Sequence, residues 1–185
     1  MKKKVYVLLA DGFELIEALT PVDVLRRGGV EVITVSISDT NEVTSAQKVT
    51  VRSDITLSQH DITDGDMLVL PGGYPGYENL ANSEEVVKLV KKYANNNRYI
   101  CAICGGPTVL SKNEILKGRL LTCHHSVADE MKAYKYTGKI VEKDENLITG
   151  IGAGRALDFA LELAKVLVAV SYTHLRAHET RSNLV

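Results

Sequence analysis

The sequence lacks three features that would quickly assign it to a special class of protein. None of its apolar runs approaches the roughly 18 residues of a membrane-spanning helix. Its 22 basic and 23 acidic residues nearly cancel, for a formal net charge of −1, so no electrostatic argument favours binding to nucleic acid or an anionic membrane. Three cysteines, an odd number, argue against a disulfide framework and indicate a reducing, cytoplasmic setting.

The two ends of the chain lack the features of functional segments. The apolar part of MKKKVYVLLADGFE is only Val5–Ala10, and no small-residue cleavage site follows, so we expect a first strand and no signal peptide. Residues 171–185, SYTHLRAHETRSNLV, have no apolar period and resemble the translation of a transposase sequencing adaptor. We therefore expect a non-native read-through tail, assign no role to His174 or His178, and place a single domain in residues 1–170.

Short apolar segments alternate with helical patterns along the 185 residues, a length that suffices for one sizeable core. Pro21 must start, kink or divide the first helix. The order strand, helix, strand repeats, which predicts an α/β fold with a mostly parallel sheet covered on both faces. We expect strands near 5–10, 30–36, 67–70, 98–103 and 119–123, helices near 15–27, 83–94, 105–112, 127–133 and 155–170, and hairpins at 49–57 (turning at 52–54) and 140–149.

Chemically useful residues follow four of the predicted strands. These segments are Asp11–Glu17, Gly72–Gly73, Cys104 and Cys123–His124. In parallel α/β sheets, ligands bind outside the carboxyl ends of the strands. We therefore expect these segments, which are distant in sequence, to converge on one rim of the sheet.

Cys104 is compatible with several chemistries. It forms a CxxC pair with Cys101, but residues three apart in a strand point to opposite faces and lie roughly 10 Å apart, whereas a disulfide needs Cα atoms within about 7 Å. A zinc site using both cysteines with Cys123, His124 and His125 is a second alternative, yet CAIC is apolar and straight, unlike a sharply turned zinc knuckle. We expect Cys101 to be a small buried hydrophobic residue.

A nucleophilic role for Cys104 explains more of its surroundings than a packed core cysteine does. Gly105 and Gly106 leave room for the sharp strand-to-helix turn that exposes a residue at the edge of a sheet, as in a nucleophile elbow. Pro107 fits the first turn of the next helix, whose N-terminal N–H groups would lower the thiol pKa and favour the thiolate. A core cysteine needs neither the glycine pair nor this position.

A reactive thiol also needs groups that move protons and stabilise an oxyanion. Glu14 and Glu17 are three residues apart, so one can face the crevice while the other faces solvent. A carboxyl group buried beside the thiol would have a raised pKa and could donate a proton to sulfur. The N–H groups of Gly73 and Gly105 form a candidate oxyanion hole. The alternative for the two glutamates is a solvated helix face, and the alternative for the glycines at 72–73 is an ordinary loop.

Two further segments at this rim leave alternatives open. His124 and His125 point in opposite directions if their strand continues, so at most one reaches Cys104, and a solvated loop histidine is the alternative. TGIGAGRA, residues 149–156, is a glycine-rich turn, but Arg155 occupies the position of the third glycine of G-x-G-x-x-G, and the following acidic residue is missing. Close backbone packing explains these glycines better than dinucleotide binding does.

Together these motifs resemble those of the ThiJ/PfpI superfamily, specifically its DJ-type branch of parkinsonism-associated, deglycase-like proteins. The matching segments keep the family order and spacing over nearly all of residues 4–168: LLADGFELIEALTPVDVLRRGGVEV, DMLVLPGGYPGYENL, ICAICGGPTVL, LTCHHSVADEM and ITGIGAGRALDFAL. The resemblance implies a flavodoxin-like three-layer sandwich, similar to class I glutamine amidotransferases, and a homodimer.

The resemblance also implies roles for individual residues. Cys104 would be the reactive cysteine at the elbow, and Glu17, rather than Glu14, would be its protonated partner. The backbone of Gly73 and Gly105 would supply the oxyanion donors, with His124 as the nearby histidine. Family members are described as metal-free and cofactor-free glyoxalases, protein deglycases, redox sensors and chaperones.

The leading hypothesis is a cofactor-free, glutathione-independent glyoxalase or deglycase that acts on methylglyoxal or glycated protein. The alternative is a redox sensor or chaperone in which Cys104 oxidises to a sulfinate. A cysteine amidohydrolase or peptidase would need an acidic partner for His124, which the sequence does not identify. The chain departs from the family pattern at Gly152–Arg155, where the usual turn is G-P-G-T and Arg155 could crowd the pocket, and beyond about Leu167, where the last helix is replaced.

Overall fold

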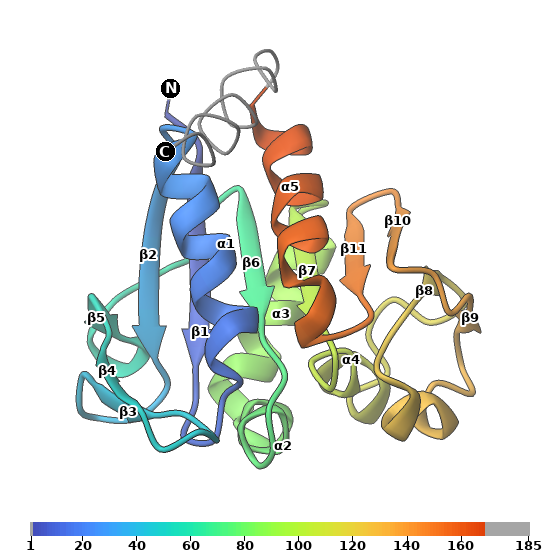
Figure 1. The fold of residues 1–185 in the computed structure, drawn as a ribbon, viewed down its shortest axis with the longest axis horizontal. Helices are drawn as coiled ribbons and strands as arrows, with labels where there is room; N and C mark the ends of the chain where they lie inside the picture. The colour runs from blue at the N-terminus through green and yellow to red at the C-terminus, as the bar shows by residue number, and fades with distance from the viewer. Residues whose placement is uncertain (1, 169–185) are drawn as a thin grey trace, which may run out of the picture.

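A seven-stranded sheet forms the centre of the computed structural model, which describes residues 2–168 (Figure 1). The strand order is β10-β11-β7-β6-β1-β2-β5. Only β10 runs antiparallel to its neighbour, and the other pairings in this sheet are parallel. The expected mostly parallel sheet is confirmed, and the tail at 171–185 lies outside the described residues. The strands are β1 Lys4–Leu9, β2 Glu31–Ser36, β5 Ile55–Thr56, β6 Met67–Leu70, β7 Tyr99–Ile103, β10 Val141–Asp144 and β11 Leu147–Gly150.

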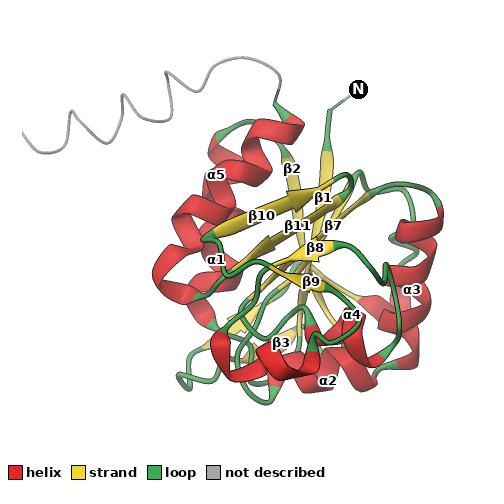
Figure 2. Ribbon diagram, turned by 90° about the vertical axis from the view of Figure 1, so that its right-hand side faces the viewer, coloured by secondary structure: helices red, strands yellow, loops and turns green. Residues whose placement is uncertain are grey.

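Helices cover both faces of the sheet and complete three layers (Figure 2). They are α1 Leu15–Arg27, α2 Gly76–Asn82, α3 Glu84–Asn95, α4 Thr108–Lys112 and α5 Ala156–Leu167, with short 3-10 turns η1 Leu57–Gln59, η2 His125–Glu130 and η3 Ala153–Arg155. The helices α1 and α5 pack on one face, in a core that includes Phe13 and Phe159, and the others pack on the opposite face, in a core that includes Leu80 and Tyr93. Within residues 2–168, no helix is both long and apolar enough to cross a membrane.

The central strands are apolar on both faces because helices cover both. Every residue of β6, MLVL, is buried, as are the last five residues of β1. This explains why the sequence shows continuous apolar runs here instead of an alternating pattern. The predicted start of α3 is confirmed, since the Ser83 hydroxyl accepts the N–H of Val86 at 3.4 Å.

The structure corrects two local predictions about strands. The first hairpin pairs β3 Glu42–Thr44 with β4 Thr50–Arg52, so it turns at residues 45–49 and not at 52–54. The β5 segment then joins the main sheet beside β2. Residues 119–123 do not form a strand of the main sheet, because β8 Leu120–Leu121 pairs with β9 Lys135–Tyr136 in a separate two-stranded sheet.

Pro21 lies inside α1, which continues on both sides of it. The helix begins at Leu15, where the Glu14 carboxylate accepts the N–H of Glu17 at 3.0 Å and so caps the first turn. It ends at Gly28, as predicted. This start places Glu17 in the first helical turn, close to the carboxyl end of β1.

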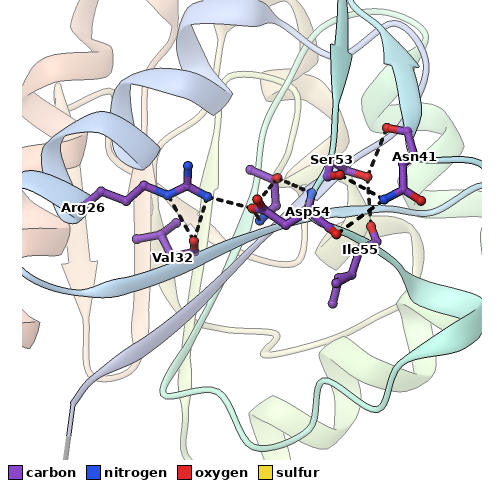
Figure 3. A network of polar contacts seen from close by, with 7 residues as sticks. Arg26, Val32, Asn41, Ser53, Asp54 and Ile55 are labelled. Atoms are coloured by element: carbon purple, nitrogen blue, oxygen red, sulfur yellow. Dashed lines mark hydrogen bonds and ion pairs between the residues drawn. The ribbon is translucent and has the colours of Figure 1, made fainter.

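A polar network ties the end of α1 to β2, next to the edge strand β5 (Figure 3). The Arg26 guanidinium donates to the Val32 carbonyl at 3.1 and 2.9 Å and to the Asp54 carboxylate at 2.7 Å. The same carboxylate oxygen accepts the N–H and the hydroxyl of Thr34, both at 2.7 Å. Burial opposes ionisation of Asp54, but the bonds from Thr34 and Arg26 outweigh it and lower the pKa of Asp54. Side chains thus reinforce the sheet edge where β5 pairs with only two residues of β2.

The site lies where the direction of strand addition reverses. The chain builds β2 and β5 on one side of β1, and then β6, β7 and β11 on the other. Ligands of such sheets bind at the carboxyl ends of the strands beside this reversal. Glu17, Gly72 and Cys104 follow β1, β6 and β7 there, so their predicted convergence is confirmed. His124 joins them through its N–H, which donates to the Cys104 carbonyl at 3.0 Å.

Candidate active site

Cys104 occupies a sharp turn directly after β7. Its φ is 62°, a left-handed conformation that costs a side chain about 1–3 kcal/mol. The Cys104 N–H donates to the Gly150 carbonyl at 2.9 Å, and the Gly106 N–H donates to the Ile103 carbonyl at 2.8 Å, which closes the turn. The structure therefore contains the strained elbow that C-G-G predicts, with a half-buried, free thiol.

Both glycines after Cys104 are required by close contacts. A Cβ on Gly106 would lie 2.3 Å from the Leu70 carbonyl oxygen, and one on Gly105 would lie 2.3 Å from Cδ1 of Tyr77. A side chain at either position would displace β6 or the tyrosine, because the interior leaves no space. The glycine pair thus permits the turn, as the sequence predicts.

Glu17, and not Glu14, is the carboxyl group beside the thiol. Its side chain is fully buried, and Oε2 accepts the N–H of Gly72 at 2.9 Å. Oε1 is also buried and has no partner of ordinary hydrogen-bond geometry in the described part of the chain. The Cys104 thiol and the Ala153 N–H are nevertheless near enough to favour the ionised carboxylate. One carboxyl oxygen is therefore anchored, while the other is available to a reacting group.

The thiol and the carboxyl group influence each other's ionisation. Burial raises the pKa of Glu17 to about 7, against the opposing effect of bonds from Cys104 and Gly72. Burial, together with the charge and hydrogen bond of Glu17, raises the pKa of Cys104 to about 12. The predicted lowering of the thiol pKa is wrong, because burial and the Glu17 carboxyl group outweigh the nearby N–H groups. Above about pH 7 the pair retains one proton, and Glu17 is fully protonated only at lower pH.

The loop after β6 holds the other two segments together. A Cβ on Gly72 would lie 2.6 Å from Oε2 of Glu17, 2.8 Å from Cβ of Cys104 and 2.9 Å from the nitrogen of Gly105. The next residue, Gly73, has a φ of 88° that favours glycine. The N–H groups of Gly105 and Gly73 face the Cys104 sulfur and favour its ionised form. These two donors occupy the positions expected for an oxyanion hole.

The backbone of His124 is hydrogen-bonded to that of Cys104, and its ring is bound by Ser126. Its Nδ1 lies 2.7 Å from the Ser126 hydroxyl and accepts the Ser126 N–H at 3.3 Å. A Cβ on Gly152 would lie 3.5 Å from Cδ2 of the ring. Burial and the neighbouring His125 lower the pKa of His124, which favours the neutral ring. His125 is exposed, with its ring centroid 4.1 Å from that of His124.

The alternative chemistries for the cysteines are not supported. Cys101 is fully buried in β7, as predicted, and burial raises its pKa well above the usual range. Cys104 lies after the end of the strand, and both cysteines contact the core beneath α1 and α5. Both thiols are free. Nowhere in residues 2–168 do three His, Cys, Asp or Glu side chains meet to hold a metal ion.

In the segment that departs from the family pattern, Gly152–Arg155, the arginine side chain is exposed to solvent. The Arg155 guanidinium lies 3.6 Å from the Asp158 carboxylate, one turn along α5, and its side chain is 55% exposed. A Cβ on Gly150 would lie 3.0 Å from the Phe159 ring, so close packing explains this glycine, but the prediction is wrong for Gly154, where a Cβ would meet no atom within 4 Å.

Sequence reasoning missed three contributors to the site. Tyr77 covers Gly105, Ala153 directs its N–H toward Glu17, and Ser126 orients the His124 ring. Only Ser126 has a sequence signal, since it follows His124 by two residues, and at this spacing the His124 side chain can accept its N–H and cap η2. The contacts of Tyr77 and Ala153 depend on the fold.

Comparisons with known proteins agree with the resemblance that the motifs indicate. Residues 3–166 match the DJ-1/PfpI family. The chain is 36% identical over 170 residues to the Parkinson disease protein 7 homolog of Danio rerio, covering 90% of each chain. It is 34% identical over 168 residues to the glutathione-independent glyoxalase DJR-1.2 of Caenorhabditis elegans, covering 90% of this chain and 89% of that protein.

The fold is also similar to a solved structure. The crystal structure of Drosophila melanogaster DJ-1beta superimposes with a TM-score of 0.90 at 33% identity, covering 100% of this chain and 99% of that chain.

Proposed function

Because the chain belongs to the DJ-1/PfpI family, we propose that it is a cysteine-dependent, glutathione-independent glyoxalase or deglycase. The observation that carries the proposal is the contact between Cys104, in its strained turn, and the fully buried carboxyl group of Glu17. The name of the C. elegans relative, a glutathione-independent glyoxalase, supports the same chemistry. The substrates would be small α-oxoaldehydes such as methylglyoxal, or the adducts they form on proteins, and the reaction would need no cofactor.

In the first step, the Glu17 carboxylate takes the thiol proton while the Cys104 sulfur bonds to the aldehyde carbon. The electron pair of the C=O bond moves to oxygen, and the N–H groups of Gly73 and Gly105 stabilise this oxyanion. Protonated Glu17 then returns the proton to the oxygen, which gives a hemithioacetal. A carboxyl group with a pKa of about 7 suits both transfers near neutral pH.

In the second step, Glu17 moves hydrogen between the two carbons of the hemithioacetal. Its carboxylate removes the C–H proton beside sulfur, and the electron pair forms an enediolate with charge on the neighbouring oxygen. The hydroxyl proton passes to that oxygen, and Glu17 delivers its proton to the neighbouring carbon. The product is a thioester of a 2-hydroxy acid, which water hydrolyses to lactate and the free thiol when methylglyoxal is the substrate. One carbon is oxidised as the other is reduced, so no external oxidant is required.

We assign His124 a supporting role at the second oxygen. Because its Nδ1 accepts the Ser126 N–H, the ring proton resides on Nε2. A neutral imidazole of this tautomer can donate a hydrogen bond to the enediolate oxygen without removing its negative charge.

Lactate formation from methylglyoxal by the purified protein tests this function. We expect Cys104→Ser to lower kcat/KM by about 100-fold or more, because the hydroxyl is a far weaker nucleophile than the thiol. Cys101→Ala is the matched control, since it alters the buried cysteine of the same strand. Activity that survives in Cys104→Ser would contradict the assigned role.

The competing function is a redox sensor or chaperone with little turnover. Both functions require the Cys104 thiolate, and the Glu17 carboxylate beside it can accept the thiol proton in either case. Mass spectrometry after mild peroxide treatment distinguishes the two functions. A gain of about 32 Da on the Cys104 peptide, without lactate production, would support the sensor.

We also propose that the enzyme is a cytoplasmic homodimer. Ile16 at the start of α1 and Leu157 at the start of α5 are 51% and 43% exposed, and the two helices pack side by side. Exposed apolar side chains on adjacent helices are suited to contact with a second copy. Light scattering coupled to size-exclusion chromatography should give a dimer mass that Ile16→Asp reduces to the monomer; a monomeric parent protein would contradict the proposal.

A further inference from the structure

Tyr77 is not used by the proposed chemistry, yet it lies directly against the turn that carries Cys104. A Cβ on Gly105 would lie 2.3 Å from Cδ1 and 2.6 Å from Cε1 of Tyr77, so the ring covers the Gly105 backbone. The N–H of that glycine faces the Cys104 sulfur. A carbon atom that bonds to the sulfur, with its oxygen accepting this N–H, would therefore have the Tyr77 ring beside it.

Tyr74 extends this aromatic surface toward solvent. The two ring centroids are 6.0 Å apart and the planes meet at 59°, a favourable geometry for aromatic rings. Tyr74 is 71% exposed, so the core does not account for it. Tyr74 lies in the loop between β6 and α2 (Figure 1), Tyr77 lies in the first turn of α2, and the Tyr77 N–H donates to the Gly73 carbonyl at 2.9 Å. The tyrosine pair, Tyr74 and Tyr77, is thus attached to the loop that supplies an oxyanion donor.

The charges around Tyr77 are unfavourable for an anionic ligand. Lys112 forms an ion pair with Glu78, which offsets the charge of that carboxylate. Glu130, at the end of η2, is close enough to act on the phenol and adds a negative charge on the same side. A ligand that contacts the tyrosine pair should therefore be neutral, and a flat group would cover more of the two rings than a methyl group can.

We propose that the tyrosine pair binds a flat, neutral aryl substituent of the α-oxoaldehyde, which makes aryl glyoxals preferred substrates over methylglyoxal. Phenylglyoxal is the simplest member of this class. The inference rests on the proposed function, because it concerns the substituent of an aldehyde that has added to Cys104. The aryl ring would pack on Tyr77 and meet the exposed Tyr74 at its edge.

The ratio of kcat/KM for phenylglyoxal to that for methylglyoxal tests the inference. We expect a ratio above one in the parent protein, a three- to tenfold decrease in Tyr77→Leu and a two- to threefold decrease in Tyr74→Ala, about the effect of one aromatic contact. Tyr77→Phe should keep the ratio within about twofold, since the ring remains. Tyr99→Leu is the matched control, because it removes a tyrosine from the opposite end of β7, and its ratio should equal that of the parent.

A second measurement separates the inference from the proposed function. Phenacyl bromide and bromoacetone both alkylate a thiol, with bromide as the leaving group, and differ only in the aryl or methyl substituent. Mass spectrometry gives the ratio of their rates at Cys104 without turnover. If methylglyoxal is not converted but Tyr77→Leu lowers the alkylation ratio at least threefold, the proposed function fails and the aryl surface stands. The inference is overturned if neither the kcat/KM ratio nor the alkylation ratio differs between the parent protein and the variants Tyr77→Leu and Tyr74→Ala, whether or not methylglyoxal is converted.

Discussion

At the scale of single residues, two unfavourable features meet at the site. Cys104 has a left-handed backbone, and Glu17 is a carboxyl group without solvent exposure. Each lowers stability when taken alone, and each serves the proposed reaction. The turn presents the sulfur to the crevice, and burial raises the carboxyl pKa into the range of a base that works near neutral pH.

The backbone strain at Cys104 is measurable by substitution. We expect Cys104→Gly to be more stable than Cys104→Ala by about 1 kcal/mol, because glycine adopts a positive φ without a steric penalty. Urea denaturation of both variants gives the difference. The same pair of substitutions at Cys101 should show the opposite order, since that residue lies within β7. Equal or reversed stabilities at position 104 would contradict the strain.

The buried carboxyl group predicts how stability depends on pH. The pKa of Glu17 is about 7 in the folded protein and 4.5 in the reference state, so the folded chain keeps a proton that the unfolded chain loses as pH rises. Stability due to Glu17 therefore falls between these values, by at most about 3 kcal/mol. Glu17→Gln should consequently be more stable than the parent at pH 8 and nearly equal to it at pH 4. Chemical denaturation at both pH values measures this, and a pH-independent difference would exclude it.

The same ionisation predicts the pH dependence of the proposed activity. The carboxylate form of Glu17 accepts the thiol proton, so kcat/KM should rise about tenfold per pH unit below pH 7 and level off above it. Initial rates of methylglyoxal consumption between pH 5 and 9 measure this rise in kcat/KM, which forms the acidic limb of the pH profile. The limb should disappear in Glu17→Gln together with most of the activity. A flat profile in the parent would show that Glu17 is not the base.

At the scale of secondary-structure elements, short segments depend on side chains for their place. The strand β5 contacts only two residues of β2, and the carboxylate of Asp54 directly before it binds Thr34 and Arg26 (Figure 3). This network fixes the end of α1, the helix whose first turn carries Glu17. An element at the edge of the sheet therefore contributes to the position of the site.

Removing the Asp54 carboxylate should destabilise this edge. Asp54→Ala leaves the part-buried N–H of Thr34 without that acceptor, so we expect a loss of about 1–3 kcal/mol in the free energy of unfolding. Asp23→Ala is the control, because its ion pair with Arg27 is solvent-exposed and should contribute less than about 0.5 kcal/mol. Thermal denaturation of both variants measures the difference, and equal effects would rule out the network.

At the scale of the whole molecule, the site is a meeting point of three chain segments. Gly72 contacts the Glu17 carboxyl group after β1 and the Cys104–Gly105 turn after β7, while it belongs to the loop after β6. These segments become neighbours only because β1, β6 and β7 lie side by side in the sheet. Because Gly72 has no Cβ, the three segments can approach one another this closely.

Gly72→Ala should therefore disrupt the site as a unit. The added methyl group would lie within 2.6–2.9 Å of atoms in the other two segments, so we expect a loss of about 1–3 kcal/mol in stability and at least a tenfold decrease in kcat/KM. Gly154→Ala is the control, since a Cβ there meets no atom within 4 Å. Denaturation and methylglyoxal assays measure both effects. A fully active Gly72→Ala would contradict the packing described.

The sequence alone determined most of the architecture and the identity of the central residue. Apolar runs such as MLVL predict buried parallel strands because helices cover both faces, and C-G-G predicts a sharp turn because only glycine fits after it. Local signals also located the cap of α3 at Ser83 and the end of α1 at Gly28. They failed for the hairpin turn at 52–54, where a tertiary network holds Asp54, and for the strand at 119–123, which pairs outside the main sheet.

Only the tertiary structure decided which groups lie beside the thiol and whether they raise or lower its pKa. Spacing allows either Glu14 or Glu17 to face the crevice, and the fold buries Glu17 while Glu14 caps the helix. The thiol pKa was predicted to fall and is instead raised, because desolvation and a neighbouring carboxyl group outweigh nearby N–H groups. Tyr77 has no local signal at all. The ionisation of the thiol and its contacts depend on the distances between segments that are far apart in the chain. The strand order sets these distances, and local sequence does not.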